Sequence, residues 1–239
     1  MIEHRPFQSL GKANHGWLNA NHHFSFARYH NPDRMGWGAL RVWNDDQIAP
    51  QSGFPPHPHR DMEIITYVRS GAITHEDHLG NRGRTEAGNV QVMSAGNGIQ
   101  HSEYNLEDEL TEIFQIWIIP SEQGGAPRWA SAEFPKGDRS GKLIPLASGR
   151  TGDDAGALTI RQDAEILGAT LKPGETISYR PAAGRGVYVV SARGAVEVNG
   201  VLLTARDGAA IKDEDTIVFS VPQASSDAAE FLLADVPLN

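Results

Sequence analysis

Short apolar runs, separated at close intervals by glycine, proline and other turn residues, dominate the pattern along this chain. The runs are rich in β-branched and aromatic residues, and no long segment shows the period of an amphipathic helix. Many short strands punctuated by turns are typical of an all-β sandwich or barrel. The predicted strands are Ala39–Trp43, Glu63–Val68, Gly71–His75, Val90–Met93, Phe114–Ile119, Gly186–Val190, Ala195–Val198, Val201–Thr204, Thr216–Val221 and Glu230–Val236.

Turn residues fix where several of these strands reverse. Asn199-Gly200 stands between two apolar runs and predicts a tight hairpin, because both residues tolerate a positive φ. Gly80-Asn81 and Asp207-Gly208 predict further turns for the same reason.

The 239 residues are long for one small barrel and sufficient for two. The segment Gly124–Arg150 is rich in glycine, serine, proline and lysine, with scattered apolar residues, and predicts a crossover between domains. We therefore expect domains at 1–134 and 135–239. The intervals Gly71–Gly88 and Gly194–Gly208 each bracket a strand, a turn and a strand, which suggests a duplicated domain.

Composition limits the classes of function. There is no cysteine, so disulfides, thiolate ligands and a cysteine nucleophile are excluded. The chain has 30 acidic and 21 basic residues, for a net charge of −9, which disfavours contact with nucleic acid. The N-terminal residues lack the apolar core of a signal peptide, and no run of about 18 apolar residues predicts a membrane span. We expect a cytoplasmic protein, monomeric and without membrane contact.

Histidine is distributed unevenly, since all ten residues fall between His4 and His101. His57-Pro58-His59 places two imidazoles at positions i and i+2, which share one face of an extended strand. Proline is poorly tolerated in a central strand, so the pair is predicted at a strand start or on an edge strand. A lone histidine is more often structural than a ligand, but this pair supplies half of a metal site.

His101-Ser102-Glu103 repeats the same spacing and predicts a second pair of side chains on one face. Three imidazoles and a carboxylate suit iron, copper, nickel, cobalt, manganese or zinc, and suit calcium or magnesium poorly. Ligand type alone does not choose among these transition metals. We expect one divalent ion, with Fe²⁺ placed first. The second half of the chain has no histidine to build such a site.

Two segments carry a resemblance to a known family. The stretch from Gly53 through His57-Pro58-His59 to Gly71 resembles the first conserved motif of cupins, and the stretch from Gly88 to His101 resembles the second. More narrowly, the chain resembles the pirin family, in its branch of bacterial pirin-like quercetin dioxygenases. The residues of this match are His22–Ala27, Gly38–Asp46, His57–His59, His75–Asp77, Gly80-Asn81, Ser94–Gly96 and His101–Glu103. The resemblance implies two cupin barrels in tandem, with metal only in the first.

Two carboxylates compete for the fourth ligand position. A typical cupin takes its carboxylate from the residue that corresponds to Glu63, which also shares the face of His57 and His59 by strict alternation. Spacing cannot separate Glu63 from Glu103. The pirin pattern implies the set His57, His59, His101 and Glu103, which leaves Glu63 either to orient an imidazole from outside the ligand set or to serve as an ordinary strand residue.

Other polar and aromatic residues have plainer interpretations. On a strand, His75 and Asp77 would share one face and His78 would take the other, which predicts a polar hairpin rather than a second metal site. Four aromatic residues of the first domain could line a substrate pocket, but core packing is the better interpretation; they are Phe24, Phe26, Trp37 and Trp43.

The resemblance implies a reaction in which O₂ opens the heterocyclic ring of a flavonol such as quercetin and carbon monoxide leaves. Glu103 is then the candidate base for the flavonol hydroxyl. The alternative is a metal-dependent, redox-sensing regulator that acts through a protein partner. Sugar-handling or isomerase chemistry is a weaker alternative, since cupin barrels host many reactions. In either main interpretation, we expect the second domain to cover an exposed edge strand of the first barrel.

Overall fold

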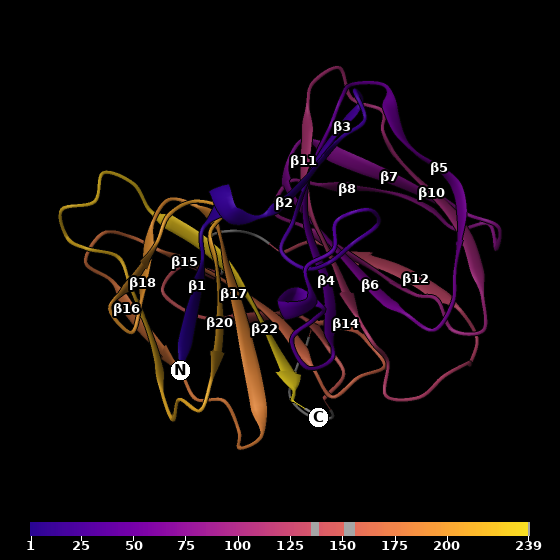
Figure 1. Cartoon of the computed structure of the whole chain (residues 1–239). Helices are drawn as coiled ribbons and strands as arrows, with labels where there is room; N and C mark the ends of the chain where they lie inside the picture. The colour runs from indigo at the N-terminus through magenta and orange to yellow at the C-terminus, as the bar shows by residue number, and fades with distance from the viewer. Residues whose placement is uncertain (135–138, 151–155, 239) are drawn as a thin grey trace.

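The computed structural model describes residues 1–134, 139–150 and 156–238. The predicted domain boundary at residue 135 lies outside these residues. Figure 1 shows two lobes of β-strands side by side, each a barrel built from two sheets. The prediction of two cupin barrels in tandem is confirmed, because each lobe pairs one seven-stranded sheet with one four-stranded sheet.

The first barrel holds the histidine-rich segments. Its large sheet has the strand order β12 (Arg128–Ala132), β9 (Val90–Ser94), β6 (Glu63–Ser70), β11 (Thr111–Ile118), β4 (Leu40–Ile48), β3 (Leu18–His22) and β2 (Gly11–Asn14). Its small sheet has the order β5 (Ser52–His59), β10 (Ile99–Asn105), β7 (Ala72–Asp77) and β8 (Arg82–Glu86).

The second barrel repeats this plan with strands from both ends of the chain. Its large sheet has the order β1 (Ile2–Arg5), β20 (Gly208–Lys212), β17 (Arg185–Arg193), β22 (Ala229–Pro237), β15 (Glu165–Leu171), β13 (Ile144–Ser148) and β14 (Leu158–Thr159). Its small sheet has the order β16 (Thr176–Tyr179), β21 (Ile217–Ser220), β18 (Val196–Val198) and β19 (Val201–Leu203).

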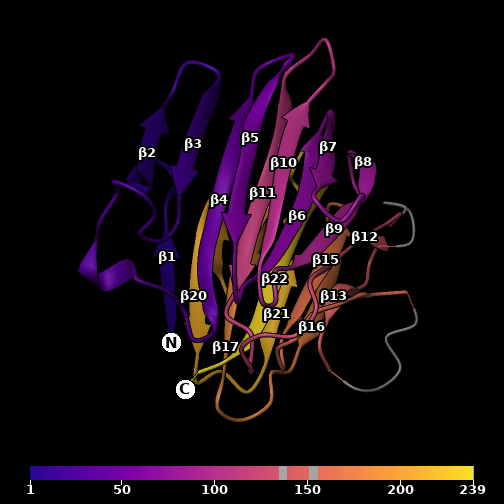
Figure 2. The ribbon, with the colours of Figure 1, turned by 90° about the vertical axis from the view of Figure 1, so that its right-hand side faces the viewer.

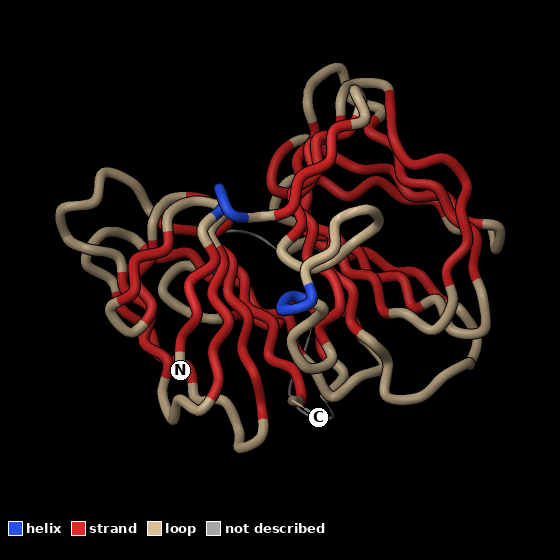
Figure 3. The backbone as a smooth tube through the Cα atoms, viewed as in Figure 1, coloured by secondary structure: helices blue, strands red, loops and turns tan. Residues whose placement is uncertain are grey.

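The two helical elements named among the described residues are single turns, η1 (Phe7–Ser9) and η2 (Pro32–Arg34), which appear in blue between the lobes in Figure 3. Asn31 caps η2 by accepting a hydrogen bond from the backbone N–H of Asp33. None of the helices that the structure describes is long and apolar enough to cross a membrane.

All ten strands predicted from the sequence are present, with ends that shift by a few residues. The hairpin at Asn199-Gly200 joins β18 to β19, and both turn residues have the positive φ that such a turn requires, 46° and 80°. β5 pairs with β10 alone, so the histidine pair does lie on an edge strand, as its proline predicts. The predicted crossover Gly124–Arg150, however, contains β12 and β13.

The suggested duplication is confirmed by the order of the small sheets. β7 and β8 form the hairpin at one end of the first small sheet, and β18 and β19 form the matching hairpin of the second. β16 therefore takes the place of β5. Its residues and those after it, through Pro181, include no imidazole where β5 carries His57 and His59. Apolar side chains fill the second barrel, among them Val198, Phe219 and Phe231.

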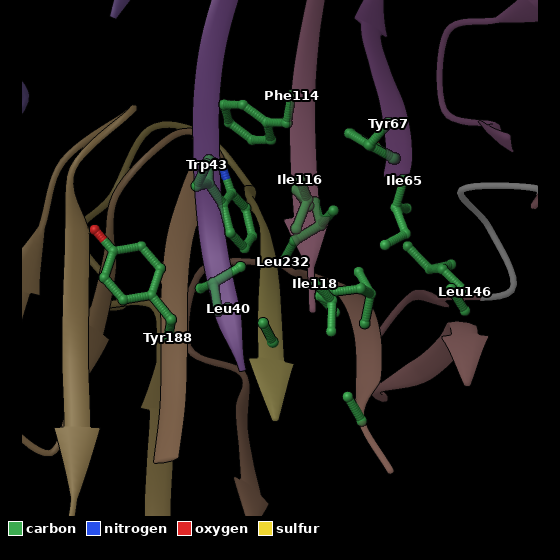
Figure 4. Close-up of a cluster of buried hydrophobic side chains, with 14 of the residues drawn as sticks. Leu40, Trp43, Ile65, Tyr67, Phe114, Ile116, Ile118, Leu146, Tyr188 and Leu232 are labelled. Carbon is green, nitrogen blue, oxygen red and sulfur yellow. The ribbon is translucent and has the colours of Figure 1, made fainter. Parts of the chain in front are cut away.

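The two barrels meet through the faces of their large sheets. Figure 2 looks onto the first barrel, with strands of the second behind it. A continuous buried cluster includes Trp43 and Phe114 of the first barrel and Tyr188 and Leu232 of the second, and Figure 4 shows these side chains between the sheets. The second barrel thus covers a face of the first large sheet, and it also meets the edge strand β12, where Arg128 donates a hydrogen bond to the carbonyl oxygen of Thr159 at 3.0 Å. The large sheet of the first barrel has apolar residues on its outer face, and the second barrel buries that face.

A buried histidine lies in this interface. His23 is fully buried, and its Nδ1 lies 2.8 Å from the hydroxyl of Tyr188 in the other barrel. Burial, assisted by the positive charges of Arg5, Arg34 and Arg206, lowers the pKa of His23 well below its usual value. The folded protein therefore holds this imidazole neutral.

This environment predicts a pH dependence of stability. Below about pH 6.5, the unfolded chain gains a proton at His23 that the folded state does not bind. The folded state is therefore fully stable with respect to this group above that pH, and it loses stability as the pH falls. The slope is about 1.4 kcal/mol per pH unit for one group. Between pH 7.5 and 5.5, the free energy of unfolding measured in urea should fall by about 1 kcal/mol less in His23→Gln than in wild type. Equal losses would contradict the assignment.

Candidate metal centre

The predicted ligand strands lie side by side. β5 and β10 are antiparallel neighbours in the small sheet, and their register places His57 directly opposite His101. The pairing shifts by one residue between His101 and Glu103, where Pro55 and Pro56 form an irregularity in β5. Proline lacks the N–H that a regular ladder needs, so the irregularity falls where the sequence cannot support pairing.

Three imidazoles converge in the part of the chain that the structure describes. The candidate ligand atoms of His57, His59 and His101 lie within 4.8 Å of one another. The Nε2 atoms of His57 and His101 are 3.1 Å apart. Two nitrogens at right angles around an ion about 2.1 Å away would be about 3 Å apart, so this separation fits a shared transition-metal ion.

The imidazoles are also in the right protonation state. Nδ1 of His57 lies 2.7 Å from the carbonyl oxygen of Pro55, which can only accept, so Nδ1 carries a proton and Nε2 is the nitrogen placed to bind an ion. Burial first, then neighbouring imidazoles, lowers the pKa of His59 and of His101 to about 3. At neutral pH these rings are neutral, and an ion need not displace a proton to bind them.

Glu103 shares the inner face of β10 with His101, as the i, i+2 spacing predicts. Along β10 buried and more exposed residues alternate, and both side chains are on the buried side, with Glu103 only 1% exposed. Its carboxylate accepts hydrogen bonds from Nε2 of Gln91 at 2.8 Å and Nε2 of Gln115 at 2.7 Å. Burial raises the pKa of this carboxyl. Glu103 is outside the group of three converging imidazoles, so its place in the ligand set stays a prediction.

Glu63 lies in a different environment. It begins β6 in the large sheet, because the chain turns between the sheets at Asp61, whose φ is 48°. Strict alternation from His57 therefore does not extend to Glu63. Its carboxylate accepts a hydrogen bond from the hydroxyl of Ser94 at 2.6 Å and lies near Arg128 and Arg161. No described hydrogen bond joins it to an imidazole, and its role beside the ligands stays a prediction.

His75 and Asp77 share one face of β7, as predicted, and that face is directed at the metal group. Nδ1 of His75 lies 3.3 Å from Nδ1 of His101, and Nε2 of His75 lies 3.2 Å from a carboxylate oxygen of Asp77. Both side chains are fully buried. His78 is exposed and bonds to the backbone of Gln100.

The aromatic residues divide between core and site. Phe24 and Trp43 are buried in the interface cluster, and Trp37 packs against it, so core packing is correct for these three. Phe26 differs, since its ring meets that of Trp117 edge to face at 5.4 Å. Trp117 in turn packs edge to face on His59, with ring centroids 5.0 Å apart.

The side of the group toward His59 is open to solvent. His57 and His59 are only half-buried, whereas His101 is buried. His59 also borders an open hollow of about 550 Å³, whose lining is completed by Pro58, Arg60, His78, Gly98, Ile99 and Gln100 and includes neither of the other two imidazoles.

Sequence reasoning did not find several residues of this site. Gln91, Gln115 and Trp117 reach it from β9 and β11 of the large sheet. Gln91 and Gln115 interrupt runs of apolar residues, and a polar residue buried within such a run is the signal that could have indicated them.

Two tandem cupin barrels with a group of three imidazoles in the first define a metal-binding bicupin protein. The comparisons with known proteins narrow this class. The sequence profile described as Pirin matches residues 3–118, and the profile described as Quercetinase C-terminal cupin domain matches residues 146–236. The chain belongs to the pirin family.

Relatives match over almost the whole chain. A pirin-like protein of Caulobacter vibrioides is 65% identical over 98% of this chain and 99% of its own length. The quercetin 2,3-dioxygenase of Escherichia coli K12 is 44% identical over 99% of both chains. The crystal structure of the bacterial pirin YhhW of Escherichia coli with nickel(II) covers 100% of both chains, at 41% identity and a TM-score of 0.91. These likenesses support a single metal ion and a metal-dependent cupin dioxygenase.

Proposed function

We propose that this protein cleaves the heterocyclic ring of flavonols such as quercetin with O₂ and releases carbon monoxide. The observation that carries the proposal is the convergence of three imidazoles at a solvent-accessible position beside Trp117. The proposed ligands are His57, His59, His101 and Glu103, with Fe²⁺ as the expected ion. The relative of 44% identity that is named quercetin 2,3-dioxygenase supports this choice of reaction.

A bound transition-metal ion supplies Lewis acidity, which lowers the pKa of a hydroxyl that it coordinates. The protein's own contribution begins with the placement of protons. Because the proton of His57 is on Nδ1, its Nε2 is free to bind, and the contact to Pro55 holds that ring orientation.

Glu103 is the proposed base for the 3-hydroxyl of the flavonol. The carboxylate is enclosed by the barrel, and the side-chain amides of Gln91 and Gln115 each donate to one of its oxygens. These two donors fix the orientation of the carboxylate, and a fixed acceptor is what general-base catalysis requires. Removal of the hydroxyl proton leaves an electron-rich flavonolate that can react with O₂.

Trp117 and Phe26 are proposed to contact the flat rings of the substrate. Both are only partly buried, and Trp117 touches the ring of His59. Aromatic side chains in this arrangement favour stacking or edge contacts with an aromatic ligand.

The test is O₂ uptake with quercetin, with loss of flavonol absorbance followed in parallel. The protein is stripped of metal and reloaded with Fe²⁺, Cu²⁺, Ni²⁺, Co²⁺ or Mn²⁺, and His59→Ala is the control. We expect O₂ and quercetin to disappear together, only with metal and only in wild type, because His59 supplies one of the three converging nitrogens.

Binding of metal without consumption of quercetin or O₂ would contradict the dioxygenase proposal and leave the metal site intact. The regulator that acts through a protein partner would then become the first hypothesis, since it requires the same site but no substrate cavity.

A further inference from the structure

His75 lies directly behind the ligand His101. It comes from β7, which pairs with β10, and the register places His75 opposite Glu103 and Asp77 opposite His101. His75 is fully buried, and its Nδ1 is 3.3 Å from Nδ1 of His101. The side of His101 that faces away from the metal group is therefore in contact with a second imidazole.

Asp77 stands at the far end of this contact and is itself held in place. Its Oδ2 lies 3.2 Å from Nε2 of His75 and accepts a hydrogen bond from the side-chain amide of Asn81 at 2.8 Å. Its Oδ1 accepts from the backbone N–H groups of Leu79 and Asn81, at 2.9 and 3.1 Å. The turn after β7 thus fixes a carboxylate beside His75.

The ring of His75 is fixed as well. It stacks on Trp129 of β12, with ring centroids 4.8 Å apart and only 7° between the planes. Stacking covers a face of the imidazole and leaves the two nitrogens at its edge available. One nitrogen is directed at His101 and the other at Asp77.

The proton positions follow from these partners. To offer the lone pair of Nε2 to a metal ion, neutral His101 must carry its proton on Nδ1. That proton is shared with Nδ1 of His75, which must then be the acceptor. With Nδ1 as the acceptor, His75 carries its own proton on Nε2, which donates to the carboxylate of Asp77. His101 thus donates to His75, and His75 donates to Asp77.

We propose that His75 and Asp77 are positioning residues that hold His101 in the tautomer that binds metal through Nε2 and raise its strength as a ligand. Outer partners of ligand histidines commonly do this, and their loss costs about 10–100-fold in metal affinity. The proposal rests on the metal-binding part of the proposed function and does not depend on the flavonol reaction.

Two substitutions of His75 separate hydrogen bonding from packing. His75→Phe keeps a flat ring to stack on Trp129 but has no acceptor for His101. His75→Asn loses the stacking ring but keeps a carbonyl oxygen near the place of Nδ1. We expect the affinity for Zn²⁺, measured by competition with a chelator, to fall about 10–100-fold in His75→Phe and to recover in part in His75→Asn. The opposite order, with Phe close to wild type and Asn weak, would overturn the proposal.

A measurement on the unaltered protein covers the case in which a variant does not fold. In Zn²⁺-loaded protein with ¹⁵N-labelled histidine, long-range ¹H–¹⁵N spectra report which ring nitrogen carries each proton. We expect a proton on Nδ1 of His101 and on Nε2 of His75, and a shifted His75 resonance in Asp77→Asn. A proton on Nδ1 of His75 would refute the series.

The outcome is independent of catalysis. If Zn²⁺ binds with these tautomers while quercetin is not consumed in any metal form, the positioning role stands and the dioxygenase proposal fails. If the wild-type protein binds no metal, the positioning role fails together with the site.

Discussion

Replacement of Glu103 by glutamine is expected to lower the turnover of quercetin by roughly 100-fold or more while most of the metal stays bound, since general-base catalysis contributes about 10²–10⁴-fold. Three imidazoles remain to hold the ion in this variant. The substitution keeps the shape of the side chain but removes the carboxylate that would accept the flavonol proton. Metal content, unfolding temperature and initial rates measured on the same preparation separate these effects.

Glu63→Gln is the matched comparison for this experiment. Glu63 is as buried as Glu103, at 1% exposure, and the chemical change is the same, but its carboxylate accepts a hydrogen bond from Ser94 rather than from Gln91 and Gln115. We expect this variant to keep most of its turnover. Unchanged activity in Glu103→Gln would contradict the proposed base. A large loss in Glu63→Gln would transfer the role to the carboxylate that typical cupins use.

The strands were predictable because their apolar runs are confined by residues with special backbone preferences. Asn199-Gly200 adopts the positive φ angles of a tight hairpin, and Pro58 keeps β5 on an edge. The pairs His57/His59 and His101/Glu103 were predictable for a similarly local reason, since residues two apart in a strand share a face. Local rules therefore indicated the three histidines that converge before any pairing was known.

Contacts between strands distant in the sequence could not be predicted in this way. Nothing in the local pattern states that β7 pairs with β10, so His75 and Asp77 were interpreted as a polar hairpin rather than as neighbours of His101. Gln91 and Gln115 reach Glu103 from the opposite sheet, and only the closure of the barrel brings them together.

The assembly of the two barrels was missed for the same reason. Sequence order assigns Ile2–Arg5 to the first domain, but β1 pairs with β20 and completes the large sheet of the second barrel. The apolar outer face of the first large sheet was likewise indistinguishable from ordinary core, because strands buried on both sides have the same near-continuous apolar pattern.

The interface predicts that the first barrel is insoluble when it is produced alone. A chain that ends at residue 134 loses the second half of the buried cluster, so Trp43, Phe114 and their neighbours are exposed together, and β1 loses its partner β20. Exposed apolar patches and unpaired strands are both causes of aggregation. We expect residues 1–134 to be found in the insoluble fraction after expression, against a soluble full chain.

Co-expression with residues 139–239 tests whether the absence of the second barrel causes the loss of solubility. The second fragment supplies β20 and the apolar face that includes Tyr188 and Leu232, so the two fragments should recover solubility and metal binding together. Trp43→Ala in the first fragment should reduce this recovery, because truncation of a buried large aromatic residue costs about 3–5 kcal/mol. A first fragment that is soluble and binds metal alone would show that the second barrel is dispensable for folding, and its role would have to lie elsewhere.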